Sequence, residues 1–147
     1  MRFQFDTNIA LHYLRKSSVM QTVESLFAPF APGQEPFLSA VSIGELRSIA
    51  IQNNWGEPRK QQLEAFFKKF IITDINNNPV LDRYADIDAF SQNKLVGKPL
   101  QLSARNMGKN DLWIAATASV LGAKLLTTDT DFDHLDLVFL DLGRVVV

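Results

Sequence analysis

The sequence predicts an α/β domain built on a parallel sheet. Short apolar segments of strand length alternate along the chain with longer segments whose apolar residues recur at helical spacing. This alternation is typical of right-handed βαβ units, whose strands pair in parallel. A length of 147 residues and a hydrophobic content of 46% suit one core, so we expect residues 1–147 to form a single domain.

The composition narrows the class of function. The formal net charge is -1, so any affinity for nucleic acid must come from a local patch of charge. The chain has no cysteine, which excludes disulfides and thiolate metal sites and agrees with a reducing cytoplasm. The amino terminus lacks the apolar run of a signal peptide, and no uncharged stretch is long enough for a bilayer. We therefore expect a cytoplasmic protein without membrane contact.

The first predicted strand is Arg2–Phe5, with Phe3 and Phe5 on one face. Asp6 follows it directly and precedes a helical pattern at Ile9–Leu14. Asp6 thus lies where a strand ends and a helix begins, a position at which an aspartate often caps the helix. Taken alone, Asp6 could be a helix cap or a functional acid.

A second strand is predicted at Phe37–Val41, after a helix at Val19–Phe27 and a loop rich in proline and glycine. Ser42 and Glu45 come next, with the S-x-x-E spacing of a capping box ahead of another helix. Taken alone, Glu45 is better explained as a helix cap than as a ligand.

The middle of the chain predicts a buried aromatic face. Four apolar residues after Pro58 recur at i, i+3, i+4 and i+7 on one helix: Leu63, Phe66, Phe67 and Phe70. We expect this stripe to be core. A brief strand at 71–72 and a further helix follow, the helix marked by Leu81, Tyr84, Ile87 and Phe90.

Periodicity fades between Asn93 and Asn110, while basic residues accumulate with no acid among them: Lys94, Lys98, Arg105 and Lys109. Long connections without secondary structure are often functional in small domains. These cations could hold the phosphates of a nucleic-acid backbone, and Arg47 could join them. The alternative is a solvated loop.

The segment 109–132 is the centre of the predicted site. Almost every residue in Leu112–Leu121 is apolar or small, which predicts a buried helix, and Gly122 is a plausible left-handed cap. Ala123–Thr128 then predicts a buried strand, with Asp129 and Asp131 at its carboxyl end. After it, we expect a last buried strand at 137–140 and an edge strand or loose tail at 143–147.

The acids of the chain fall at positions that a parallel sheet brings together. Asp6, Glu45, Asp111, Asp129 and Asp131 lie at strand carboxyl ends or at the adjacent helix starts. In a doubly wound sheet these points share one edge. Two carboxylates about 4 Å apart repel by roughly 4 kcal/mol at an effective dielectric constant near 20, so a cation is expected among them. Oxygen ligands without cysteine favour Mg²⁺ or Mn²⁺, which suits phosphoryl chemistry with an activated water.

Four segments in this order resemble the PIN-domain ribonucleases, especially the VapC-type toxins of bacterial toxin-antitoxin pairs. They are DTNIALHYLR at 6–15, SIGELR at 42–47, NDLWIAATA at 110–118 and LLTTDTDF at 125–132. The resemblance spans nearly the whole chain. It implies a three-layer α/β/α sandwich with a central five-stranded parallel sheet, RNA cleavage with Mg²⁺ or Mn²⁺, a homodimer, and inhibition by a small antitoxin protein.

The resemblance also assigns residues by position. The catalytic and metal-binding acids of the family match Asp6, Glu45, Asp111 and Asp129, with Asp131 at a further acidic position that many members keep. Asn8 and Thr128 fall where the family places polar support for the site. The products would carry a 5′-phosphate and a 3′-hydroxyl.

Two alternatives remain open from the residues. A haloacid-dehalogenase-type phosphatase also has an aspartate after its first strand, but it needs a second aspartate where this chain has Asn8. A non-catalytic module could bind RNA or a protein through the groove that the converging acids would form. A joint measurement of RNA binding and cleavage would separate that module from a nuclease.

Overall fold

The protein folds around one parallel sheet of five strands with the order β3-β2-β1-β4-β5. The structure, a computed structural model, describes residues 1–147. In chain order the elements are β1 (Arg2–Phe5), α1 (Thr7–Arg15), α2 (Ser18–Phe27), β2 (Glu35–Ser39), α3 (Ala40–Gln52), α4 (Glu57–Phe67), β3 (Ile71–Thr73), α5 (Asn78–Ser91), α6 (Lys109–Leu121), β4 (Lys124–Thr127), the 3₁₀ helix η1 (Thr130–Leu135) and β5 (Asp141–Arg144). The predicted α/β fold with a parallel sheet is confirmed.

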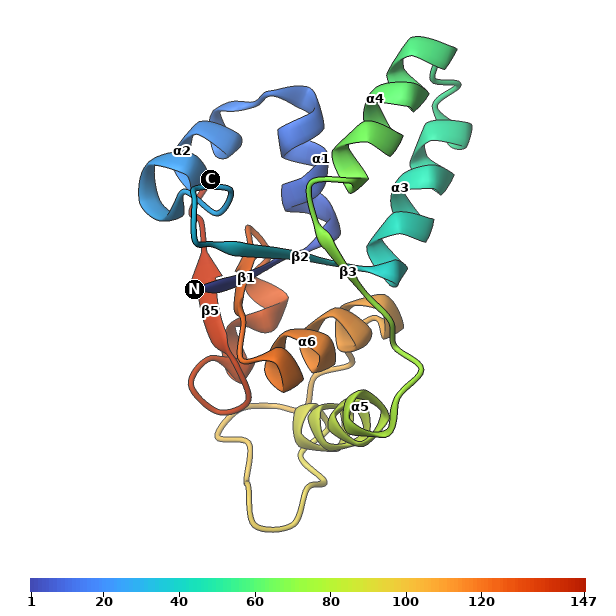
Figure 1. The fold of residues 1–147 in the computed structure, drawn as a ribbon. Helices are drawn as coiled ribbons and strands as arrows, with labels where there is room; N and C mark the ends of the chain where they lie inside the picture. The colour runs from blue at the N-terminus through green and yellow to red at the C-terminus, as the bar shows by residue number, and fades with distance from the viewer.

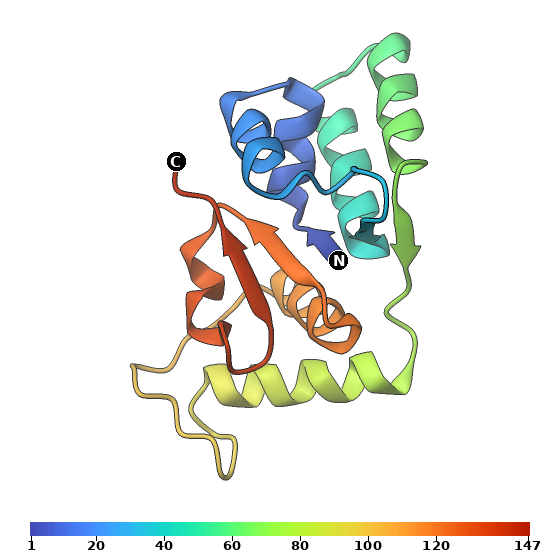
Figure 2. The ribbon, with the colours of Figure 1, turned by 60° about the vertical axis from the view of Figure 1, so that its left-hand side comes forward.

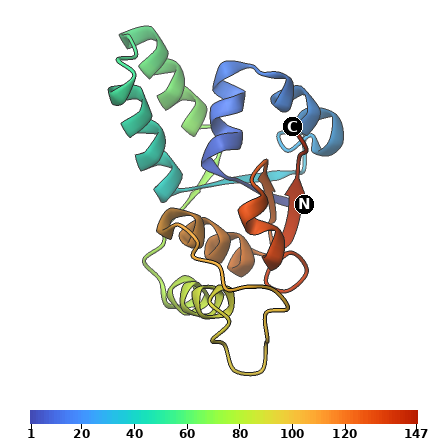
Figure 3. The same ribbon diagram turned by 180° about the vertical axis from the view of Figure 1, so that it is seen from behind.

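The sheet lies between two layers of helices (Figure 1). Helices α1 to α4 cover one face, and α5 and α6 cover the other, as the view from behind also shows (Figure 3). Two apolar clusters match these layers, one containing Phe3 and Phe5 and the other containing Ile87 and Ile114. The expected three-layer sandwich is therefore confirmed. None of the helices combines the length and hydropathy needed to span a bilayer.

The order of the strands creates a switch point between β1 and β4. From β1 the chain adds β2 and β3 outward on one side, and it then returns to place β4 and β5 on the other side (Figure 2). Phe5 pairs with Leu126, and the Asp6 N–H donates to the Leu126 carbonyl at 3.1 Å. Open α/β sheets bind ligands at such a point, beyond the carboxyl ends of the strands.

The polar residues of β1 do not reduce its burial. Gln4 is fully buried, and its Nε2 donates to the Ile114 carbonyl of α6 at 2.9 Å. Arg2 lies at the exposed start of the strand, where its guanidinium donates to the Leu121 carbonyl. β1 is therefore a central strand in which a hydrogen bond compensates the amide nitrogen of Gln4, while the amide oxygen is buried without a partner.

The aromatic stripe and the buried helix are confirmed, whereas Leu81 of the helix between them is 40% exposed and its neighbour Val80 is buried. The aromatic stripe is core, since Leu63, Phe66 and Phe67 of α4 and the following Phe70 are all buried. The interior of α6 is buried as well, and Gly122 ends that helix in the left-handed conformation at φ 63. Residues 92–108 form no helix or strand, as expected. Leu100 and Met107 of this loop are buried in the apolar cluster of α5 and α6, and part of the loop projects beyond these helices (Figure 1).

The predicted capping box is wrong. β2 ends at Ser39, whose side chain caps α3 by accepting from the Val41 N–H at 3.1 Å. The helix therefore begins before Ser42, which is fully buried within it. Glu45 lies further along α3 and is free of a capping role.

The last strand is also placed differently from the prediction. Residues 137–140 form a loop in which Leu137 has a φ of 61 and is 86% exposed. Only Leu140 of this apolar run is buried, and it lies at the end of the loop just before β5. β5 pairs with β4 from Asp141 to Arg144 at the edge of the sheet, so the edge-strand alternative for 143–147 is correct for its first two residues.

β5 requires a glycine where it lies against β4. A Cβ at Gly143 would lie 2.8 Å from Leu126 Cδ2, and Leu126 is fully buried. We expect Gly143→Val to lower the free energy of unfolding by about 1–3 kcal/mol through overpacking, measured by urea denaturation. An unchanged midpoint would show that β4 and β5 are not packed as described.

Candidate metal centre

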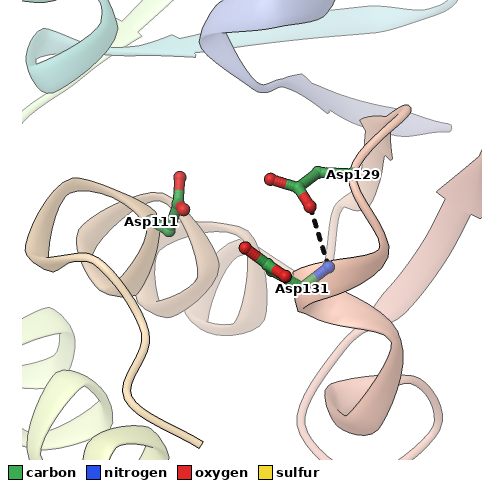
Figure 4. Close-up of side chains that lie close together, drawn as sticks. All are labelled: Asp111, Asp129 and Asp131. Carbon is green, nitrogen blue, oxygen red and sulfur yellow. Dashed lines mark hydrogen bonds between the residues drawn. The ribbon is translucent and has the colours of Figure 1, made fainter.

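Three carboxylates from separate elements meet beyond the switch point of the sheet. Asp111, Asp129 and Asp131 each offer an oxygen, and these oxygens lie within 4.8 Å of one another. Asp111 belongs to the first turn of α6, Asp129 follows β4, and Asp131 lies in η1 (Figure 4). The sequence prediction that distant acids converge is therefore met by these three residues.

Local hydrogen bonds fix the loop that carries two of these acids. Asp129 caps η1, with Oδ1 accepting from the Asp131 N–H at 2.9 Å (Figure 4). The Asp129 N–H donates to Thr127 Oγ1, also at 2.9 Å. The turn is thus defined by its own polar groups, and the second oxygen of Asp129 makes no hydrogen bond within the protein.

Asp6 is only 4% exposed and lies close enough to the cluster for the charges of Asp111 and Asp129 to act on it. One oxygen accepts from the Ile9 N–H at 2.8 Å, so the helix-cap interpretation is correct, and the other accepts from the Thr127 hydroxyl. The pKa of Asp6 is raised to about 7, first by burial and further by the charges of Asp111 and Asp129, against the opposing effect of the two hydrogen bonds. Asp6 therefore combines a structural role with an electrostatic link to the cluster.

Glu45 reaches the site from α3. Its Oε1 accepts from the Thr7 hydroxyl at 2.7 Å, and Thr7 Oγ1 lies 2.9 Å from the Ser42 hydroxyl. The pKa of Asp111 is raised to about 6 by burial and then by the charges of Asp129, Glu45 and Asp131. Glu45 is thus close enough to act on Asp111, although it stands outside the group of three.

None of the five acids forms an ion pair with a basic side chain. The ion pairs of the chain join other residues: Arg2 with Glu35, Arg47 with Glu64, Lys60 with Glu57, Lys124 with Asp141, and Arg144 with Asp133. The donors at the cluster are carboxylate oxygens, which hard divalent cations prefer. The residues therefore fit a Mg²⁺ or Mn²⁺ ion, which Asp111, Asp129 and Asp131 could hold directly.

The polar side chains next to the acids differ from the two that the resemblance assigned. Asn8 is exposed, and neither Asn8 nor Thr128 makes a side-chain hydrogen bond, whereas Thr7 contacts Glu45 and Thr127 contacts Asp6. The pairing of Phe5 with Leu126 makes Asp6 and Thr127 neighbours across two strands. The contact between Thr127 and Asp6 could be predicted from the sequence only if the register of β1 and β4 was known.

The predicted RNA-binding cations are scattered. Arg105 shares a surface hollow with Asp131, and Lys109 is exposed at the start of α6. Arg47 is bound to both oxygens of Glu64 and is not an unpaired cation. Lys98 lies 4.6 Å from the centre of the Phe139 ring, and Lys94 is exposed. Of the five, only Arg105 lines a hollow together with an acid of the cluster.

Comparison with known proteins identifies the family model that describes the chain. Residues 4–137 match the model of the PIN domain. No curated protein sequence matches at a significant level.

Solved structures share the fold at low sequence identity. A chain of VapBC2 from Rickettsia felis, bound to a DNA fragment from their promoter, is 20% identical with a TM-score of 0.77 and 98% of each chain covered. A chain of VapBC-1 from nontypeable Haemophilus influenzae is 20% identical with a TM-score of 0.75 and the same coverage. A chain of FitAcB from Neisseria gonorrhoeae is 22% identical with a TM-score of 0.70, covering 98% of this chain and 97% of its own.

Proposed function

Because the chain belongs to the PIN-domain family, we propose that it is an endoribonuclease that depends on Mg²⁺ or Mn²⁺ and acts as the toxin of a toxin-antitoxin pair. The observation that carries the proposal is the group of Asp111, Asp129 and Asp131, whose oxygens lie within 4.8 Å of one another. None of the three forms an ion pair with a basic side chain. A site of this kind attracts a divalent ion and, through it, the phosphate of a substrate.

The residues of the proposed site have distinct roles in binding the ion and the substrate. A bound divalent ion supplies an activated water and neutralises charge on the phosphate that is attacked. Asp111, Asp129 and Asp131 bind the ion, while Asp6 and Glu45 add negative charge nearby. Thr127 orients Asp6, and Thr7 orients Glu45. Arg105, beside Asp131, binds a flanking phosphate of the RNA.

The proposed partners are an antitoxin protein and a second copy of the chain. Structures of similar fold come from complexes named VapBC, and one is named a toxin-antitoxin complex from Klebsiella pneumoniae. We extend this partnership to the present chain, where an antitoxin would cover the acidic groove. Light scattering of the purified protein, alone and with the product of an adjacent small gene, measures both assemblies.

Cleavage of RNA in a metal titration tests the proposed function. Purified protein with Mg²⁺ or Mn²⁺ should cut cellular RNA internally and leave 5′-phosphate ends that accept a ligated adaptor without prior treatment. Excess EDTA should stop the reaction. RNA binding without cleavage at any metal concentration would instead support the non-catalytic module, and cleavage in EDTA would exclude the metal-dependent mechanism.

The phosphatase alternative has no support in the geometry. That chemistry needs a second carboxylate close to Asp6, at the position of Asn8. Asn8 is exposed on α1 and makes no contact with the Asp6 carboxylate through a hydrogen bond. A small phosphoester should therefore release no phosphate in the presence of the protein.

A further inference from the structure

An open groove of about 660 Å³ lies beside the acid cluster, between α3 and α6. Glu45 and Gly44 line it on the α3 side, Asn110 and Trp113 line it on the α6 side, and Ile75 closes it after β3. The groove is separate from the space that Asp111, Asp129 and Asp131 share, because none of these three residues lines it.

The groove adjoins the acid site through two of its lining residues. Glu45 acts on the charge of Asp111, and Asn110 immediately precedes Asp111 in the first turn of α6. Both residues are also walls of the groove. A substrate whose phosphate lies at the acids would therefore place its adjoining nucleoside at the mouth of this groove.

The lining of the groove does not suit a phosphate. Glu45 is its only charged residue, and no lysine or arginine lines it. The Trp113 ring lies against Tyr84 with centroids 4.1 Å apart, so its position is fixed by packing within the protein. Ile49 and Ile75 add apolar surface, while Gln52 and Asn110 add amides that can both donate and accept hydrogen bonds.

A flat, neutral, heteroaromatic group matches this lining. Proteins that bind single-stranded RNA place its bases on aromatic side chains and read the base edges with hydrogen bonds. We propose that this groove binds one unpaired nucleobase of the RNA substrate, the base next to the phosphate held at the acids. The inference rests on the proposed function, since it names the substrate contact of the same site.

Gly44 keeps the groove open. It lies within α3 and lines the groove, and a Cβ built on it meets no atom within 4 Å. A side chain at this position therefore starts in open space at a residue that lines the groove, and it also removes the cost of a glycine inside a helix. Gly44→Leu should block the groove in a protein that is folded at least as well as the wild type.

Trp113 offers a direct signal of base binding. The second tryptophan, Trp55, is buried under the Arg59 guanidinium, 3.9 Å from the ring centre, and does not line the groove. In a Trp55→Phe background, adenosine 5′-monophosphate with Mg²⁺ should quench the fluorescence saturably, because adenine stacks on the remaining indole. Ribose 5-phosphate, which lacks the base, should not. Neither probe has a phosphodiester bond, so no cleavage occurs during the titration.

The matched variants decide the outcome. Gly44→Leu should weaken the binding of adenosine 5′-monophosphate by about tenfold or more. Gly56→Leu should leave it unchanged, because Gly56 lies at the start of α4 away from the groove, where a Cβ meets only Pro58 Cδ at 3.8 Å. Equal quenching by adenosine 5′-monophosphate and ribose 5-phosphate would overturn the inference. An unchanged affinity of Gly44→Leu for adenosine 5′-monophosphate would also overturn it.

The same variants separate this inference from the proposed function. Base-dependent quenching in a protein that cleaves no RNA would support base binding in the groove and exclude the proposed nuclease function. Metal-dependent cleavage with an unchanged KM in Gly44→Leu would support the nuclease function and exclude base binding in the groove. If Gly44→Leu instead abolished the binding of an antitoxin and left quenching intact, the groove would be a protein-docking surface and the inference would be wrong.

Discussion

Replacing Asp6 with asparagine, Asp6→Asn, is expected to lower the rate of RNA cleavage by about 100-fold or more. Asp6 lies at the switch point of the sheet, is 4% exposed and adds its charge to that of Asp111 and Asp129. The asparagine keeps the size of the side chain and removes that charge. The proposed metal centre would therefore lose affinity for its ion and the means to activate water.

The fold of this variant should survive. The Asn oxygen can still accept the Ile9 N–H that Asp6 now accepts, since asparagine is a good helix cap. Removing a buried charge among like charges should leave the melting temperature in EDTA unchanged or higher. Asp82→Asn, on the exposed surface of α5, is the matched control and should keep full activity. Full cleavage by Asp6→Asn, measured on the same RNA, would exclude the proposed mechanism.

The stability of the metal-free protein is expected to fall as the pH rises from about 4 to about 7. Burial raises the pKa of Asp6 to about 7 and that of Asp111 to about 6, from an unperturbed value of 3.8. Within this window the folded protein holds protons that the unfolded chain has released, so a higher pH favours unfolding. We expect the melting temperature in EDTA to be at least about 5 °C lower at the upper end of the window.

A divalent cation should reverse this loss. An ion that binds only the folded protein stabilises it by mass action, and protons compete with it for the same carboxylates. Saturating Mn²⁺ should therefore raise the melting temperature more above about pH 7 than near pH 5. The Asp6→Asn variant should show a flatter pH profile in EDTA. A melting temperature that does not respond to Mn²⁺ at either pH would contradict a formed ion site.

The general position of the acids could be predicted from the sequence because it follows from topology. Alternating strand and helix patterns predict parallel strands, and the carboxyl ends of parallel strands share one edge. Asp129 and Asp131 after β4, and Asp111 in the first turn of α6, meet there as expected. Asp6 after β1 acts on the same charges.

The details that the sequence missed depend on register and on competition between neighbours. Thr127, and not Thr128, contacts Asp6, because the pairing of β1 with β4 sets which hydroxyl faces the carboxylate. Ser39 is the N-cap of α3, whereas the S-x-x-E spacing had predicted Ser42 at this position. Both errors are shifts of a few residues, which local patterns alone do not resolve.

The bounds of the last strand were misplaced for a different reason. Residues 137–140 are apolar enough to indicate a buried strand, yet Leu137 and Val138 are exposed in a loop that follows η1. The strand forms instead at Asp141–Arg144, where Gly143 permits close packing on β4. Tertiary packing, and not the hydrophobic pattern, determines which residues form this strand.

Direct titration of Mn²⁺ into the protein by isothermal calorimetry tests whether the separated acids form one ion-holding pocket. Wild-type protein should bind Mn²⁺ saturably, and Asp111→Asn, Asp129→Asn and Asp131→Asn should each weaken binding by about tenfold or more. Asp82→Asn should bind as the wild type does. Equal Mn²⁺ affinity in all of these proteins, or no binding at all, would contradict the account of this site.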